Sequence, residues 1–234
     1  MNNLTKLLFC SLFIWSTALR SQNVAEQPGF LKKANRHEKN GWIYLHIEGS
    51  PRERGYQHGS LMAPEIKENL RLLRARWEYQ TALDWSWYVQ KAGEVLSTKV
   101  DPENMEELDG IVEGMKSAGV TTSRNEMVGL NGYAELMGYW WPTVKDSVKV
   151  QFNIQPKESC SSFIATGNMT ADGKIVLGHN TMDYYYSPLC IIILDILPEK
   201  GHRILMQSVA GFIHSETDFF ITDAGLVGSE TTIG

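Results

Sequence analysis

The sequence predicts an α+β protein, because its hydrophobic period changes from helical to strand-like near residue 160. Before that point, apolar residues recur at helical spacing over long stretches, and after it short apolar runs alternate with turn residues. The chain has 234 residues, 43% hydrophobic and 21% charged, which is typical of a globular protein of one or two domains. Its net charge of -5 provides no basic surface, so nucleic acid is not expected as a partner.

The first 21 residues predict a secretory signal peptide. Lys6 supplies the positive charge, residues 7–19 form the apolar run, and Ala18 or Ser21 offers a small residue for cleavage. The run is too short, and too polar at its end, for a membrane span, so no integral membrane span is expected. We therefore expect the mature protein to be secreted or periplasmic.

The first half of the mature chain is predicted to be mainly helical. Residues 22–40 are polar and predict a linker, and residues 41–48 alternate like a strand. Residues 52–59 are charged and contain glycines, which predicts a loop. The apolar spacing then predicts helix from Ser60 to about Lys99.

Two further helices have recognisable ends. Asp101 and Pro102 are typical of a helix start, and Gly119 is placed to end that helix. A capping box at residues 123–126 predicts another helix through about Asn131. Aromatic residues gather at 77–88 and 139–141, where they either line an apolar ligand cleft or fill buried helix faces.

The second half is predicted to form strands. The first two would make a hairpin that turns at Asp172 and Gly173. The third is almost entirely apolar, as in a strand covered on both faces. The predicted strands span residues 161–166, 174–180, 189–197, 203–209 and 218–226.

Cys160 begins the first of these strands, directly after a loop-like segment where the chain could be cut. A cut there would give the cysteine a free α-amine with a pKa of ~7.7–8, able to accept the thiol proton at neutral pH. The alternatives are a small buried cysteine, or a disulfide to Cys190 that would remove the nucleophile. Cys190 itself lies in an apolar run and is expected to fill the core. The six histidines lack zinc-ligand spacing, and no metal or organic cofactor is expected.

Four segments, in order, resemble the N-terminal-nucleophile (Ntn) hydrolases. Residues 160–167 and 170–180 are similar to the start of the catalytic chain in the phospholipase B-like proteins and the penicillin acyltransferase-type autoproteolytic acyltransferases, and more distantly in bile-salt hydrolases. Residues 54–59 and 107–114 resemble the pro-segment of the acyltransferase group, and residues 222–233 a later strand pair. The likeness extends from about Trp42 to the last residue.

The resemblance implies an Ntn-hydrolase-like αββα sandwich, two stacked sheets between helical layers, preceded by a helix-rich pro-segment. Residues 22–159 would be the pro-segment, and residues 160–234 the start of the catalytic sheet domain, with Cys160 opening a central strand of an antiparallel sheet. Because residues 160–234 lack the covering helices, we expect an incomplete sandwich: a C-terminally truncated member, or the front part of a split one.

The resemblance also implies roles for individual residues. Cys160 would attack the Ser159 carbonyl, release itself as the new amino terminus, and then attack the substrate. Asn180 and Asp183 lie where the family has an Asn-x-Asp motif, although the spacing here is one residue longer. His179 stands where bile-salt hydrolases have an arginine, and it would hydrogen-bond the thiolate or the substrate carbonyl.

The oxyanion site of the family corresponds to Glu230 and Thr231, where backbone N–H groups or a Thr hydroxyl would serve. Simpler alternatives stand beside these roles: a strand-end histidine satisfied by backbone for His179, and a turn-forming residue for Asp183. Arg54 and His58 are expected to be structural.

Three functions follow. The first is a secreted Ntn-type hydrolase or acyltransferase that cleaves an amide, or an ester, of an apolar acyl group, with the pro-segment and catalytic chain remaining associated after self-cleavage. The second is phospholipase B-like deacylation of a lipid. The third is a non-catalytic protein that keeps the fold and binds or supports another molecule.

Overall fold

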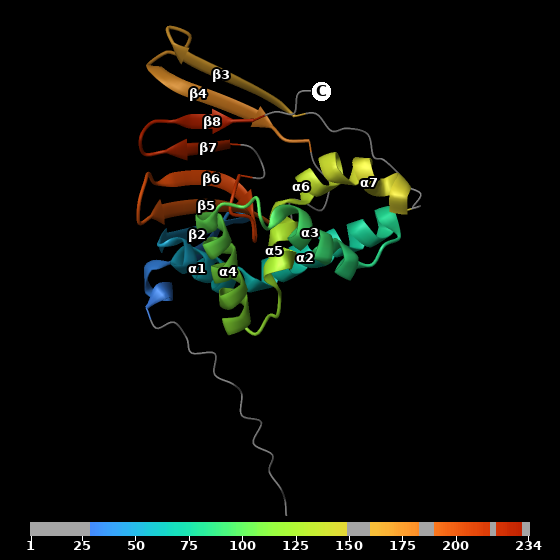
Figure 1. Cartoon of the computed structure of the whole chain (residues 1–234). Helices are drawn as coiled ribbons and strands as arrows, with labels where there is room; N and C mark the ends of the chain where they lie inside the picture. Colours follow the sequence, from blue (N-terminus) through green and yellow to red (C-terminus); the bar gives the residue numbers. More distant parts are fainter. Residues whose placement is uncertain (1–28, 149–159, 183–189, 216–218, 231–234) are drawn as a thin grey trace, which may run out of the picture.

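The computed structural model describes residues 29–148, 160–182, 190–215 and 219–230, and it confirms the α+β class (Figure 1). The helices of the first half lie against a sheet built mainly from the second half. The signal-peptide prediction falls outside the described residues. Within those residues, no helix is both long enough and apolar enough to cross a membrane.

A six-stranded sheet is the centre of the structure. Its strand order is β1-β2-β5-β6-β7-β8. β2 and β5 are parallel, whereas the other neighbouring pairs are antiparallel. The strands are β1 (Asn35–Lys39), β2 (Trp42–Gly49), β5 (Ile191–Pro198), β6 (Ile204–Val209), β7 (Phe219–Thr222) and β8 (Val227–Ser229). The described strands of the second half pair with one another in antiparallel fashion, as expected from sequence. The parallel pair was not expected, and it arises because the chain leaves β2, builds the helices, and returns beside β2 in the same direction.

The described part of the predicted linker before β2, residues 29–40, is also structured. A short 3-10 helix, η1 (Phe30–Lys33), precedes β1, and β1 pairs with β2 in a hairpin. The turn between them contains Asn40 and Gly41, both at positive φ. An Asn-Gly turn of this kind suits the twist of a two-residue hairpin, so a polar segment forms an edge strand.

The predicted strand at residues 218–226 is shorter than expected, because its second half is a turn that leads into β8. β7 ends at Thr222, and Gly225 at φ +81° lets the chain reverse into β8. Thr222 Oγ1 accepts a hydrogen bond from the Leu226 amide at 3.1 Å, which closes the turn.

β3 (Ser161–Gly167) and β4 (Gly173–Asn180) form the predicted hairpin. They are assigned to a two-stranded sheet of their own, and β4 lies beside β8 (Figure 1). Within the described residues β3 pairs with β4 alone. Cys160 therefore precedes an outer strand, and the prediction of a central strand is wrong for the described part of the chain.

The helices pack on one face of the six-stranded sheet. Leu45, Ile47, Ile192 and Leu194 point to that face and are almost completely buried. The opposite face carries Leu205 and other partly exposed apolar side chains, and the described residues contain no second sheet over it. The helical segments are α1 (Pro51–Leu61), α2 (Ala63–Thr81), α3 (Trp85–Leu96), α4 (Pro102–Ser117), α5 (Arg124–Asn131), α6 (Tyr133–Glu135), the π-helical turn η2 (Leu136–Trp140) and α7 (Trp141–Val148).

α1 occupies the segment predicted as a charged loop. Ser50 caps it in a reciprocal capping box with Glu53, and Pro51 occupies its first position. Apart from Tyr56, the buried positions of α1 are held by polar residues and glycines, so the helix lacks the apolar spacing by which helices are recognised.

The predicted helix at residues 60–99 is broken between α2 and α3. Ala82 adopts a left-handed conformation, and Asp84 caps α3 by accepting from the Ser86 amide. Asp101 stands at the N-cap of α4 as predicted, although its side chain makes no capping hydrogen bond. Ser123 and Glu126 form the predicted capping box of α5.

The aromatic clusters are part of the helix layer. Trp77, Tyr88 and Trp141 are at most 1% exposed and lie in a continuous set of ring contacts that includes Trp77–Trp141 at 5.4 Å between centroids. The structure therefore favours the interpretation that these clusters fill buried helix faces over the one in which they line a ligand cleft. Tyr79 and Tyr139, at 85% and 75% exposed, are exceptions.

Candidate functional site

The candidate site lies at the open end of the β3–β4 hairpin, where Cys160 immediately precedes β3. Cys160 is half-buried, and its thiol is free rather than part of a disulfide. Ser161 pairs with Asn180 and Ser162 with His179. Since side chains alternate along a strand, Ser162 and His179 share one face, and the same alternation carried back from Ser161 assigns Cys160 to that face.

His179 links the hairpin to the segment after β8. Its Nε2–H donates to the Glu230 carbonyl at 2.9 Å, and its Nδ1 accepts from the Thr181 hydroxyl at 3.0 Å. These two bonds engage both ring nitrogens. The geometry thus matches the strand-end histidine satisfied by its surroundings, and within the described residues His179 makes no hydrogen bond to Cys160.

The other expected site residues are only partly visible. Asn180 is exposed and faces the side opposite His179, and Glu230 is exposed with its carbonyl facing His179. Ser159, Asp183 and Thr231 lie outside the described residues. The structure therefore brings Cys160, His179 and Glu230 to one end of the hairpin.

An apolar hollow of about 470 Å³ extends from His179 along the sheet. Ile175 and Leu177 contribute from β4, and Ile221 and Val227 from β7 and β8. His179 is the one polar side chain among the residues that line it. A hollow with this lining suits an apolar group.

Cys190 is unsuited to chemistry. It is 2% exposed, its Sγ donates to the Glu65 carbonyl at 3.7 Å, and burial raises its pKa to about 11. At neutral pH it is a protonated core residue, as the sequence predicted. In the described part of the chain, no group of three or more His, Cys, Asp or Glu side chains is arranged to hold a metal ion.

The two segments that resemble an acyltransferase pro-segment meet in the structure. Gly55 and Gly59 of α1 face Gly110 and Gly114 of α4, and a Cβ at any of the four would collide with the backbone of the other helix. Beside this contact, buried Arg54 donates to the Glu107 carboxylate at 2.6 Å. Burial raises the pKa of Glu107, and the Arg54 guanidinium acts in the opposite direction. These buried residues fix the two helices together.

His58 is structural, as expected from the sequence, but its hydrogen-bond partner was not expected. It is completely buried in α1, and its Nε2 accepts from the Gly211 amide at 3.0 Å. Its Nδ1 has no hydrogen-bond partner, and burial lowers its pKa to about 4. Only the folded chain shows this contact, because 153 residues separate the two groups.

Comparisons with known proteins add a distant similarity. No model of a known protein family matches the chain. An uncharacterized protein of the archaeon Archaeoglobus fulgidus is 28% identical over 188 residues, which cover 74% of this chain. The chain spans only 30% of the length of that relative.

Proposed function

We propose that this chain belongs to a Cys-dependent Ntn-type hydrolase or acyltransferase that cleaves an amide, or an ester, of an apolar acyl group. The observation that carries the proposal is the position of Cys160: a free thiol directly before the first strand of a hairpin whose other strand, β4, lines an apolar hollow. A thiol there becomes an N-terminal nucleophile if the Ser159–Cys160 bond is cut. An Ntn-like sandwich would place a second sheet over the open face of the six-stranded sheet.

The proposed chemistry has two acyl transfers by one sulfur. In the first, Cys160 Sγ attacks the Ser159 carbonyl carbon, the peptide C–N bond breaks as the α-amine takes a proton, and water hydrolyses the resulting thioester. In the second, the free α-amine accepts the thiol proton while sulfur attacks the acyl carbonyl of the substrate. The leaving group takes that proton, and water or an amine then releases the acyl group.

We propose that the two chains remain together after the cut. β2 belongs to the first chain and pairs in parallel with β5 of the second over seven residue pairs. The helices of the first chain also cover the apolar face of the strands of the second. Separating them would expose this shared core to water, so the cut protein should elute as a single species.

The decisive experiment follows intact mass with time for the wild type and for Cys160→Ala. The wild type should split between Ser159 and Cys160 and hydrolyse acyl amides, whereas Cys160→Ala should do neither. Cys160→Ser should cut more slowly, because a hydroxyl is a far weaker acid than a thiol. Cys190→Ser is the matched control: its hydroxyl can also donate to the Glu65 carbonyl, and it should cut like the wild type.

Two outcomes would contradict the proposal: an uncut wild type that hydrolyses acyl substrates, or activity that survives in Cys160→Ala. Preference for phospholipid esters over acyl amides would favour the lipid deacylase instead. A binding protein with the same fold is the alternative of a different class, and it is supported by the engagement of both His179 nitrogens. Self-cleavage without any turnover, or neither reaction, would favour that alternative.

A further inference from the structure

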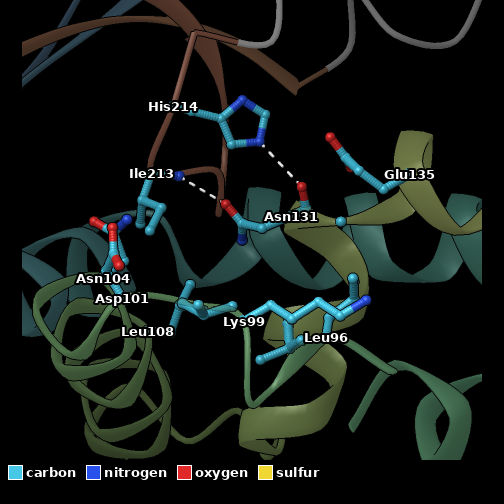
Figure 2. A pocket seen from close by; sticks show the side chains of 12 residues that line it. Leu96, Lys99, Asp101, Asn104, Leu108, Asn131, Glu135, Ile213 and His214 are labelled. Atoms are coloured by element: carbon cyan, nitrogen blue, oxygen red, sulfur yellow. Dashed lines mark hydrogen bonds between the residues drawn. The ribbon is translucent and has the colours of Figure 1, made fainter. Parts of the chain in front are cut away.

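A second hollow lies where the helix layer meets the loop after β6 (Figure 2). Its volume is about 360 Å³, within the range of small-molecule pockets. The α3–α4 connection, the start of α4, the end of α5 and residues 213–214 surround it. Its apolar wall consists of Leu96, Val100, Leu108, Val128 and Ile213.

The loop that closes this hollow is held in place by side chains of three helices. Asn69 Nδ2 donates to the Ala210 carbonyl at 3.0 Å, and His58 accepts from the Gly211 amide. Asn131 donates to the Gly211 carbonyl at 2.9 Å and accepts from the Ile213 amide at 2.9 Å. Because these bonds fix the loop backbone, the hollow is formed before any ligand arrives, and binding has little ordering cost.

The charges at the rim are unbalanced. Asp101 and Glu135 are exposed carboxylates that line the hollow, and Lys99 is the opposing cation. Within the described part of the chain, these three side chains form neither an ion pair nor a hydrogen bond. His214 Nε2–H donates to the Asn131 carbonyl at 3.2 Å, and burial lowers the pKa of His214. The Glu230 carboxylate also acts on His214, which adds negative potential nearby.

We infer that this hollow binds a small organic ammonium ion, with its apolar body against Leu108 and Ile213 and its charge drawn by the rim carboxylates. The apolar wall excludes a bare metal ion or a purely polar solute, and the excess of carboxylates disfavours an anion. This inference goes beyond the proposed function, because binding here requires neither Cys160 nor self-cleavage.

The test is an NMR titration of the full chain, with labelled Leu, Val and Ile methyl groups, using n-hexylamine and n-hexanoate as probes of equal length and opposite charge. Hexylamine should shift the methyl signals of Leu96, Leu108, Val128 and Ile213 in a saturable way, and hexanoate should shift them far less. Cys160→Ala should bind hexylamine like the wild type, which separates this result from that of the self-cleavage experiment.

Three variants that each remove one charge test whether the rim carboxylates attract the ammonium ion. Asp101→Asn and Glu135→Gln should each weaken hexylamine binding by up to about fivefold, the upper range for an exposed ion pair. Lys99→Gln should strengthen it, because the competing positive charge is gone. Glu199→Gln removes an exposed carboxylate in the turn after β5 and should change nothing. Equal or tighter binding of hexanoate, affinity indifferent to the Asp101 and Glu135 changes, or no saturable shift would each overturn the inference.

Discussion

Cys160 and Cys190 show that surroundings rather than residue type decide which thiol can react. Cys190 is enclosed by the core and directs its Sγ to a backbone carbonyl, and burial raises its pKa to about 11. Cys160 is half-buried at the end of a hairpin. The sequence distinguished them by context alone, an apolar run against a strand start, and the structure agrees about Cys190.

We expect selective alkylation of Cys160. Iodoacetamide near pH 8 reacts with thiolates, and Cys190 remains protonated and enclosed there. Peptide mass spectrometry over time should find the label on Cys160 long before it appears on Cys190. In denaturant the two cysteines should be labelled at similar rates. Faster labelling of Cys190 in the folded protein would contradict the described burial.

The buried, neutral His58 should make the protein less stable in acid. Its pKa is about 4 in the folded state and ~6.5 when unfolded, so the unfolded chain binds the proton more tightly. The stability associated with neutral His58 is fully present above pH ~6.5 and is lost as the pH falls toward about 4. At pH ~4.5 the loss should be about 2–3 kcal/mol.

His58→Gln isolates this contribution, because a Gln carbonyl can accept from the Gly211 amide but does not titrate. The free energy of unfolding of both proteins is measured by urea denaturation near pH 7 and pH 4.5. The carboxylates titrate alike in the two proteins, so their contribution cancels in the comparison. The wild type should lose about 2–3 kcal/mol more than the variant on acidification. Parallel pH profiles would show that His58 is not buried in its neutral form.

At the scale of elements, the contact between α1 and α4 explains two of the segments that resemble a family. Both helices present glycines four residues apart, which lets their backbones touch. Around the contact, Arg54 also donates to the Gly49 carbonyl at 3.0 Å, and so ties the end of β2 to the helix pair. These segments therefore serve the packing of the two helices.

Gly55→Ala should destabilise the protein strongly. The added methyl would lie well inside contact distance of the Glu107 carbonyl oxygen, so the helices must separate or shift. Overpacking of this kind typically costs ~1–3 kcal/mol, and the rigidity of two backbones favours the upper end. The free energy of unfolding from urea denaturation is the measurement.

Gly138→Ala is the matched control, because it also lies in a helical turn but a Cβ there meets nothing within 4 Å. It should be neutral or stabilising by about 0.5–1 kcal/mol, since alanine is the better helix former. A Gly55→Ala variant as stable as Gly138→Ala would mean that the two helices do not touch through their backbones.

At the scale of the whole molecule, the first and second halves of the chain share one sheet. The sequence pattern changes near residue 160, but the sheet is not divided there. β2, from before residue 160, pairs with β5, from after it. One face of the sheet is buried by helices, and the other leaves Leu205 and Ile221 46% and 48% exposed. An apolar face of this kind is where a second layer of structure would pack.

Export remains a prediction for the whole chain. Lys6 followed by an apolar run predicts a signal peptide that is removed on secretion. Mass spectrometry of the protein recovered from the exported fraction should show a new amino terminus between about Leu19 and Asn23. A mature chain that retains Met1 would contradict the prediction.

The sequence by itself determined the features that depend on near neighbours. The capping box at Ser123 and the turn at Gly173 are set within a few residues, and the apolar run around Ile192 needs only its own composition. The burial of Cys190 follows from the same run. Local backbone preferences and hydrophobic period therefore gave the α+β class and the β3–β4 hairpin.

Only the tertiary structure decided what depends on distant partners. α1 is a helix without an apolar stripe because Gly55 is buried against α4, and β2 is parallel to β5 because the intervening helices carry the chain across the sheet. The neutral state of His58, the engagement of His179 by Glu230 and the hollow beside Asn131 all require groups far apart in the chain. Such contacts leave no local periodicity in the sequence, because their energies arise only when the folded chain brings the partners together.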